Sequence, residues 1–295
     1  MSAAPMPTQR STLTNTSMIV AAIVSEQVGA ATAATVFDDV GAYGMVFLRL
    51  GFAAVILWAV GRPRLRGRSR HDWVITASFG ALTALLILAS FAAVDRLPLG
   101  LVVTIELLGP LGLATVMSRR AREFAWTGVA LLGVVLLGET GDGIDALGIV
   151  WALVGALAWA GYIVLGAETG RRSENLDSLA LALTVSAVLT APLGIVGAGS
   201  ALLEPRVLAI GAGVALLSSV VSVALSVAAL RDVSARTYGV LMSLSPAIAS
   251  LAGFVVLDQR LSAIQLVAIA LVIVASAATV SSTTPSSSSG TTSST

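Results

Sequence analysis

Long apolar stretches alternate with short polar connections along the whole chain. Runs of about 18 or more apolar residues predict helices that cross a membrane. We expect ten such helices, at residues 17–37, 42–60, 73–94, 98–117, 124–138, 146–167, 178–199, 206–229, 237–257 and 261–280. The fifth has the fewest apolar residues, and Ser25, Glu26 and Gln27 interrupt the first. The connections leave no room for a soluble domain, so the pattern predicts an all-α membrane protein.

Both ends of the chain are polar. We expect residues 1–16 to be a flexible N-terminus and the Ser/Thr-rich residues 281–295 to be a disordered tail. The first apolar run is read as a retained helix rather than a signal peptide. Its core contains Ser-Glu-Gln, and Arg10 is the only basic residue before it.

Composition agrees with a membrane protein and argues against an enzyme. Hydrophobic residues make up 56 % of the 295 residues and charged residues 11 %, against about 25 % charged in soluble domains. There is no cysteine, no lysine and one histidine, His71, in a charged loop. These absences argue against a thiolate or histidine metal site, a Ser-His-acid triad and a lysine-containing phosphate loop. We therefore expect no catalysis, no cofactor and no bound metal.

The arginines predict the orientation of the helices, because short cytoplasmic loops of membrane proteins are rich in basic residues. They gather in alternate connections: Arg62, Arg64, Arg66, Arg68 and Arg70, then Arg119, Arg120 and Arg122, then Arg171 and Arg172, then Arg231 and Arg236. The intervening connections are acidic or balanced. This alternation fits ten helices with both termini in the cytoplasm, and places the chain in the plasma (inner) membrane. The five-arginine loop is read as a topology signal in preference to a lipid-headgroup or nucleic-acid site.

The chain also contains an internal repeat. The segment from Arg96 and the segment from Val233 share an apolar helix with a proline, a charged turn and another apolar helix, and Pro110 aligns with Pro246. We predict two five-helix repeats, residues 17–140 and 141–280. Because five is odd, the second enters the membrane from the opposite side. Such inverted repeats, with helices broken at matching positions, are typical of secondary transporters and mark a site near the midplane.

Two strings carry a resemblance to a known family. "DRLPLGLVVTIELLGPLGLATVMSRR" and "YGVLMSLSPAIASLAGFVVLDQRLSAIQLVAIALVIVAS" resemble the paired EamA repeats of the drug/metabolite transporter superfamily, and most of all its threonine/homoserine exporter branch. The resemblance implies ten helices, cytoplasmic termini, a central cavity between the halves and ion-driven export of small metabolites. Many relatives have a glutamate before the second proline or a Gly-Glu turn after the ninth helix. Here those positions are Ser245 and Leu257–Asp258.

Glu106 is the first candidate for transport chemistry. It lies about nine residues into its helix, or roughly 12 Å along it. An ionised side chain at such a depth costs at least about 2.5–3.5 kcal/mol. Because burial favours a neutral carboxyl group, Glu106 could bind a substrate ammonium when ionised and release it when protonated. The alternative is a buried Glu–Arg pair that fixes helix packing.

Arg49, Glu26 and Gln27 are the other polar residues expected deep in the membrane. Arg49 could pair with Glu106 or Glu26, hold a substrate carboxylate, or serve structure alone. Glu26 and Gln27 are adjacent on a helix and therefore point about 100° apart. We expect one of them to face the site and the other to face a neighbouring helix.

Five further residues are weaker candidates. Trp159 and Tyr162 share a helix face and could line a cavity or simply pack. Tyr238, Ser243 and Ser245 surround the second break, where hydroxyls could bind substrate or satisfy freed backbone groups.

These patterns together predict a secondary transporter that exports small metabolites, most of all amino acids such as threonine or homoserine, by proton-coupled alternating access. The expected partners are an amino-acid-like substrate, protons and the lipid bilayer, with no nucleic acid; monomer and homodimer are both left open. The alternatives are a multidrug or cationic-compound efflux transporter and a non-transporting scaffold or sensor. A scaffold has no reason to keep two midplane carboxylates unless the protein pairs both.

Overall fold

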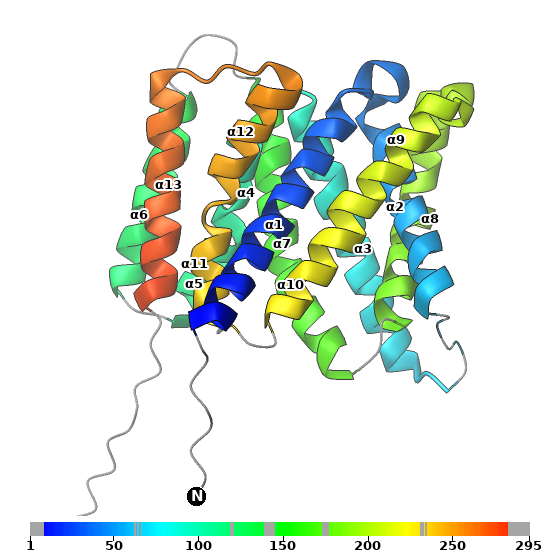
Figure 1. The fold of residues 1–295 in the computed structure, drawn as a ribbon, viewed down its shortest axis with the longest axis horizontal. Coiled ribbons are helices and arrows are strands. Elements are labelled where there is room, and N and C mark those ends of the chain that lie inside the picture. The colour runs from blue at the N-terminus through cyan, green and yellow to red at the C-terminus, as the bar shows by residue number, and fades with distance from the viewer. Residues whose placement is uncertain are drawn as a thin grey trace, which may run out of the picture.

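The computed structural model describes residues 9–282, apart from 62, 64, 66, 119–120, 139–144, 173–176, 231–232 and 234. Every regular element in the described residues is a helix (Figure 1). The elements in chain order are α1 (Gln9–Ala34), α2 (Phe37–Gly61), α3 (Arg70–Val94), α4 (Leu99–Glu106), α5 (Leu108–Ser118), α6 (Ala121–Gly138), α7 (Ala146–Arg172), α8 (Asp177–Ala198), the 3₁₀ helix η1 (Gly199–Leu203), α9 (Pro205–Ala215), the π-helix η2 (Leu216–Val221), α10 (Ser222–Leu230), α11 (Ala235–Met242), α12 (Ser245–Leu257) and α13 (Ala263–Ser282).

Among the described residues, nine helical spans are long and apolar enough to cross a membrane. The tenth predicted span corresponds to α6, whose apolar part, Phe124–Val134, is shorter. The structure thus confirms the all-helical membrane fold and the weakness of the fifth run. It differs at the N-terminus, where α1 begins at Gln9, although its apolar span starts at Thr16. The polar first turns extend the helix beyond its apolar part. Residues 1–8 and 283–295 of the predicted flexible ends lie outside the described residues.

Local sequence signals explain where several helices begin and end. Ser69 accepts a hydrogen bond from the Asp72 N–H and Asp72 accepts one from the Ser69 N–H, each at 3.1 Å, which forms a capping box before α3. Ser262 and Gln265 exchange the same two bonds before α13. Gly41 has φ 67° and ψ 165°, so it interrupts the start of α2. The regular part of α2 therefore begins where the hydrophobic pattern predicts the second helix, at residue 42.

Helix packing repeats between the first half, α1 to α6, and the second half, α7 to α13. The contact of α3 with α7 has a counterpart in that of α10 with α1, and α3–α8 has a counterpart in α9–α2. Likewise α4–α7 matches α12–α1, while α2–α8, α4–α12 and α6–α13 join equivalent helices of the two halves. The arrangement is consistent with two related five-helix repeats.

The two halves run in opposite directions through the bundle. The start of α1 and the end of α13 lie at its lower end in Figure 1, and α6 with α13 forms the edge opposite α2, α8 and α9. Consecutive spans alternate in direction, so α7 starts at the upper end while α1 starts at the lower end. An odd number of spans in each half produces this inversion.

Small residues bring the helices into close contact. A Cβ atom added at Gly109 on α5 would lie 1.9 Å from the Ala156 carbonyl oxygen on α7, so only glycine fits there. Ser186 on α8 donates to the carbonyl oxygens of Gly80 on α3 and of Ala182, at 2.6 and 2.9 Å. Within a bilayer such close approach stabilises helix pairs through van der Waals contact, since lipid tails supply no hydrophobic force between helices.

Candidate substrate site between the two halves

The fourth and ninth spans are both broken at matching positions. In the first half α4 ends at Glu106 and α5 begins at Leu108; in the second half α11 ends at Met242 and α12 begins at Ser245. Pro110 and Pro246 lie in the first turn after each break. Proline has no N–H, so the carbonyls of Glu106 and Met242 lose the donor that a continuous helix would supply. The backbone break is thus shared by both halves, and a carboxylate is present at only one of them.

Glu106 is buried, with 7 % of its surface exposed. The Ser90 hydroxyl on α3 donates a hydrogen bond to its Oε1 atom. On the other side, a Cβ atom added at Gly155 on α7 would lie 2.6 Å from the same Oε1. The carboxylate at the first break is therefore held between α3 and α7. The sequence gives no signal that pairs Ser90 with Glu106, and reasoning from sequence missed it.

Arg49 on α2 lies among the buried acidic groups without bonding directly to them. Its exposed fraction is 8 %, and its guanidinium carbon is 5.4 Å from the centre of the Phe91 ring. It interacts electrostatically with Glu26 and Glu106. Within the described part of the chain, however, no ion pair of 4 Å or less joins it to either carboxylate, and its Nε atom has no hydrogen-bond partner. A direct Glu–Arg pair, one of the alternatives that the sequence leaves open, is therefore absent among the described residues.

Glu26 belongs to the same group of charges, and the neighbouring Gln27 does not. Ser222 on α10 interacts with the Glu26 carboxylate, which also interacts with Arg49 and Glu106. Gln27 is buried, and its side chain has no hydrogen bond to any described residue. Gln27 is thus the more deeply buried of the two adjacent residues.

The π-helix η2 fixes the part of α1 that carries Glu26. Ser25 donates to the Leu217 carbonyl oxygen at 2.8 Å, and Ser218 donates to the Glu26 carbonyl oxygen at 3.3 Å. The wider turn of a π-helix occurs often at functional sites. Here it brings Leu217 and Ser218 of the eighth span against α1, and Ser222 follows directly after it.

Two predicted tyrosines join this group, while Trp159 does not. Tyr162 stacks on Phe79 with ring centres 4.8 Å apart and interacts electrostatically with Glu26 and Arg49. Tyr238 lies 3.4 Å from Ser226 through its hydroxyl, and it interacts with Glu26 and Tyr162. Trp159, one turn before Tyr162, packs instead in an apolar cluster made of Leu107, Leu111, Ala130, Val272 and Ala275.

The two serines at the second break have different surroundings. Ser243 donates to the Gly239 carbonyl oxygen and to the Ser276 hydroxyl on α13, each at 3.1 Å. Ser245 is 1 % exposed, and its hydroxyl has no partner among the described residues. Ser243 therefore ties the break to its neighbouring helix, and Ser245 keeps an unused hydroxyl.

We call Glu26, Arg49, Glu106, Tyr162 and Tyr238 the central polar group. Its members come from α1, α2, α4, α7 and α11, so both halves contribute. No cluster of three or more histidine, aspartate and glutamate side chains that could hold a metal occurs in the described ranges. The arrangement offers one cation and two anions in a buried setting.

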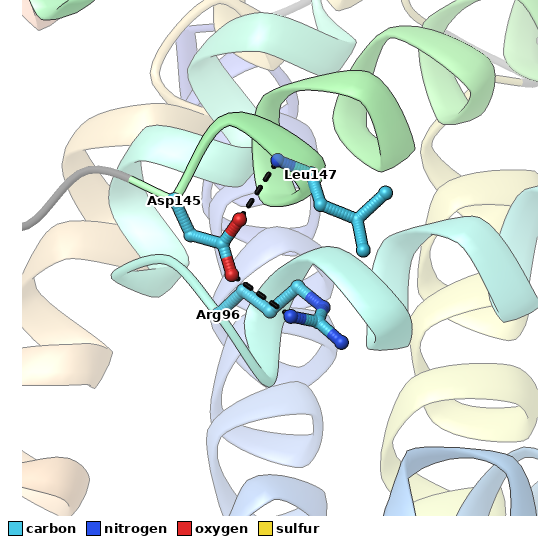
Figure 2. Close-up of polar contacts among 3 residues, drawn as sticks. All are labelled: Arg96, Asp145 and Leu147. Atoms are coloured by element: carbon cyan, nitrogen blue, oxygen red, sulfur yellow. Dashed lines mark hydrogen bonds and ion pairs between the residues drawn. The ribbon is translucent and has the colours of Figure 1, made fainter.

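A directly bonded ion pair lies at the opposite end of the bundle from the start of α1. Arg96 Nη1 and Asp145 Oδ2 are 2.8 Å apart, and Asp145 Oδ1 accepts the Leu147 N–H at the start of α7 at 2.8 Å (Figure 2). The Arg96 guanidinium, aided by the Leu147 N–H, holds the pKa of Asp145 below its ordinary value. Asp145 in turn raises the pKa of Arg96. This pair joins the third–fourth connection of the first half to the beginning of the second.

Two more polar contacts join the halves at that end. Arg206 at the start of α9 lies 3.5 Å from Asp39 at the start of α2. Gln259 Oε1, after α12, accepts the Leu99 N–H at the start of α4 at 3.0 Å. The end of the molecule that the arginine pattern assigns to the outside is thus tied together by side chains of both halves.

Comparison with known proteins agrees with this architecture. Residues 146–281 match the EamA-like transporter family. The threonine/homoserine exporter RhtA of Salmonella typhimurium (strain LT2) is 34 % identical over 259 residues, which cover 85 % of this chain and 86 % of the exporter. RhtA of Escherichia coli K12 is 33 % identical over the same coverage. A solved crystal structure with 22 % identity covers 92 % of this chain and 95 % of its own at a TM-score of 0.56, which supports the fold alone.

The family resemblance seen in the two proline-containing strings is thereby confirmed, and the family is one of transporters rather than enzymes. The helical spans make the protein a multi-pass membrane protein. Its sequence relationship along most of both chains and its fold lead to one conclusion: the chain belongs to the EamA-like transporter family.

Proposed function

We propose that this transporter exports small zwitterionic amino acids of the threonine/homoserine type by alternating access, with the central polar group as its recognition site. The observation that carries the proposal is the state of Arg49. It is buried, interacts electrostatically with two carboxylates without an ion pair of 4 Å or less to either, and has an Nε atom without a partner among the described residues. Ionisable residues inside a membrane protein are rare and mark substrate or ion pathways.

The charges of the group fit the two ends of an amino acid. A guanidinium can bind a carboxylate through two parallel hydrogen bonds, so Arg49 would hold the substrate carboxylate. Glu26 and Glu106 would receive its ammonium. The relatives whose names specify threonine and homoserine support this substrate class. Gln27, which is buried, and Ser245, whose buried hydroxyl has no partner among the described residues, are proposed to contact the side-chain hydroxyl of the substrate.

The same charges support proton coupling. Two carboxylates and one guanidinium leave one negative charge, and a zwitterion does not change that sum. A single proton on Glu106 would neutralise the group, and burial away from water favours the protonated form of a carboxyl group. Competition between this proton and the substrate ammonium would link export to the proton gradient.

The other predicted roles follow from their surroundings. Tyr162 and Tyr238 would line the site beside Glu26, whereas Trp159 and Ser243 serve packing. Pro110 and Pro246 would shape the two breaks. A cationic-drug exporter is the second candidate, because the net charge is negative. Arg49 in the middle of the group disfavours a ligand that carries only positive charge.

The arrangement in the membrane is also a proposal. We infer two inverted repeats, residues 17–140 and 141–280, in the inner membrane, with both termini on the arginine-rich cytoplasmic side. The common end at which α1 begins and α13 finishes supports this orientation (Figure 1). Whether one copy or a homodimer operates does not alter the site, because one chain supplies the whole group.

Exchange of labelled amino acids in proteoliposomes tests the proposal, with and without a pH gradient. We expect threonine and homoserine to exchange and Glu106→Gln to lower the rate at least about tenfold, equal to about 1.4 kcal/mol. Glu204→Gln, a matched change at an exposed glutamate before α9, should keep the wild-type rate. Movement of cationic dyes without amino acids would overturn the substrate class. A normal rate and normal pH dependence in Glu106→Gln would overturn its role.

A further inference from the structure

The Glu106 carboxylate has two unlike oxygen atoms. Oε1 accepts the Ser90 hydroxyl from α3 and faces the backbone of α7 at Gly155. Oε2 has no hydrogen bond to a described residue. Ser90 belongs to the first half and Gly155 to the second, so the Oε1 atom is enclosed from both sides of the interface between the halves.

Gly155 leaves space for the Glu106 carboxylate, because a side chain at this position would collide with it. At Gly109 on α5, an added Cβ would meet the backbone of α7. At Gly155 the three nearest atoms to an added Cβ all belong to the Glu106 side chain, with Oε1 at 2.6 Å and Cδ and Cγ at 3.3 Å. A methyl group there would therefore displace the carboxylate rather than push the two helices apart.

The charged groups around Glu106 are few. Arg49 on α2 and Glu26 on α1 interact with it, and Ser90 on α3 hydrogen-bonds to it. The other elements packed against α4 are α5, α7, α12 and α13. Of these, α5, α12 and α13 carry no charged residue, and the charged residues of α7 lie in its last turns. The position of the Glu106 carboxylate relative to Arg49 and Glu26 is thus set by Ser90 and by the space at Gly155.

We propose that Ser90 and Gly155 are positioning residues that hold Glu106 Oε1, so that Oε2 alone exchanges a proton for the substrate ammonium. The inference rests on the proposed function and extends it to two residues outside the central polar group. A proton on Oε2 leaves the Ser90–Oε1 bond intact, since a carboxylic acid still has a carbonyl oxygen that accepts. The carboxyl group therefore keeps one position in both protonation states.

Transport kinetics in proteoliposomes test the space at Gly155. Gly155→Ala should raise the KM for labelled threonine about tenfold or more, because the carboxylate moves away from the ammonium position. Gly112→Ala on α5, where an added Cβ meets nothing within 4 Å, is the matched control and should keep the wild-type KM. Both variants should elute as monodisperse protein with the wild-type melting temperature.

A double variant separates positioning from packing. Glu106→Asp withdraws the carboxyl group from Gly155, so adding Gly155→Ala to Glu106→Asp should change the residual exchange rate less than about threefold. If the rate of the double variant falls by the product of the two single effects, Gly155 acts through helix packing and the proposal is wrong.

The Ser90 bond is tested by pH dependence and by spectroscopy. Ser90→Ala should move the pH profile of transport to higher pH, because a hydroxyl that donates to the ionised carboxylate no longer opposes its protonation. Ser90→Thr keeps the hydroxyl and should restore the profile. Infrared difference spectra follow the carboxyl band that Glu106→Gln removes, with no substrate present. In Ser90→Ala, the pH midpoint of this band should also move to higher pH.

The outcomes distinguish the two proposals. A wild-type protein that moves no amino acid contradicts the proposed function, while the infrared shift in Ser90→Ala still supports the positioning role. An infrared band with an unchanged pH midpoint in Ser90→Ala, or a wild-type KM in Gly155→Ala, overturns the positioning role whatever the substrate is.

Discussion

Two groups of arginine and acidic side chains in this protein show opposite geometry. At the end of the bundle opposite the start of α1, Arg96 and Asp145, which we call the outer pair after the predicted orientation, are more than a third exposed and bond directly at 2.8 Å. In the central polar group Arg49 and Glu106 are buried and Glu26 is half-buried, yet no ion pair of 4 Å or less joins them among the described residues. The group that would gain most from direct pairing is the one that lacks it.

The difference distinguishes a structural contact, the Arg96–Asp145 pair, from a site whose charges remain available to a ligand, the central polar group. A charge taken out of water costs several kcal/mol, and direct pairing with good hydrogen bonds offsets part of that cost. Exposed pairs gain little because water already solvates both partners. A fold selected for stability alone would pair Arg49. Its separation from both carboxylates is explained if a substrate carboxylate and ammonium complete the contacts.

Removal of the Arg49 charge should have the largest effect. Arg49→Leu leaves two carboxylates without their cation and removes the proposed carboxylate ligand, so exchange of labelled threonine should fall at least about 30-fold. Arg49→Lys keeps the charge but loses the planar guanidinium that binds a carboxylate through two hydrogen bonds. Its exchange rate should lie between those of the wild type and Arg49→Leu. Initial rates in proteoliposomes measure both. A wild-type rate in Arg49→Leu would show that the buried group is as structural as the outer pair.

Glu26→Gln should have the next largest effect. It removes one of two carboxylates that face the substrate ammonium and keeps the side-chain volume, so we expect the KM to rise about tenfold. Asp38→Asn, at an exposed acidic residue in the first turn of α2, is the control and should leave the KM unchanged. If Glu26→Gln and Asp38→Asn changed the KM equally, Glu26 would not be part of the substrate site.

Pro110→Ala tests whether the buried group depends on the helix break. The alanine N–H can donate to the Glu106 carbonyl, which would continue the helix and turn the carboxylate away from Ser90. We expect the exchange rate to fall about fivefold to tenfold. Pro192→Ala removes a proline inside α8 and should change the rate less than about twofold. A larger loss from Pro192→Ala would mean that helix shape in general, rather than this break, controls transport.

Disruption of the outer pair should have the smallest effect. The pKa of Asp145 is depressed in the folded protein, so the pair contributes stability above the ordinary aspartate pKa, about 3.9, and loses it as the pH falls through the lowered value. Arg96→Ala should lower the melting temperature at pH 7 by no more than about 2 °C. The difference from wild type should vanish near pH 2–3. Transport at pH 7 should stay near the wild-type rate, and a loss as large as that of Arg49→Leu would contradict the comparison.

Much of the fold was predictable because hydropathy is a local property. The apolar runs locate the helices, and Pro110 and Pro246 mark the two breaks, because a proline alters the backbone wherever it lies in a helix. The depth of Glu106 follows from its place in its run. The fifth span is as short in apolar residues as its sequence indicates. The helical start at Gln9 was not predicted, because polar residues outside an apolar span can still continue a helix.

The composition of the site was less predictable, because it depends on how each helix is rotated against its neighbours. Sequence grouped Trp159 with Tyr162 because they share a helix face. Packing places Trp159 in an apolar cluster, whereas Tyr162 stacks on Phe79 and interacts electrostatically with Glu26. Met242, which corresponds to Glu106 in the second half, packs against the apolar cluster around Ile19 and Ile23. The two breaks are alike in backbone and different in surroundings.

The sequence by itself thus determined that this chain crosses a membrane as two inverted sets of helices with one carboxylate beside a broken helix. Tertiary structure decided which side chains surround that carboxylate. Hydrophobic periodicity and proline act along a single helix, and their effects appear in the order of residues. The approach of Ser90, Arg49 and Gly155 to Glu106 joins four helices, and their relative rotation is set by the packing of all of them together.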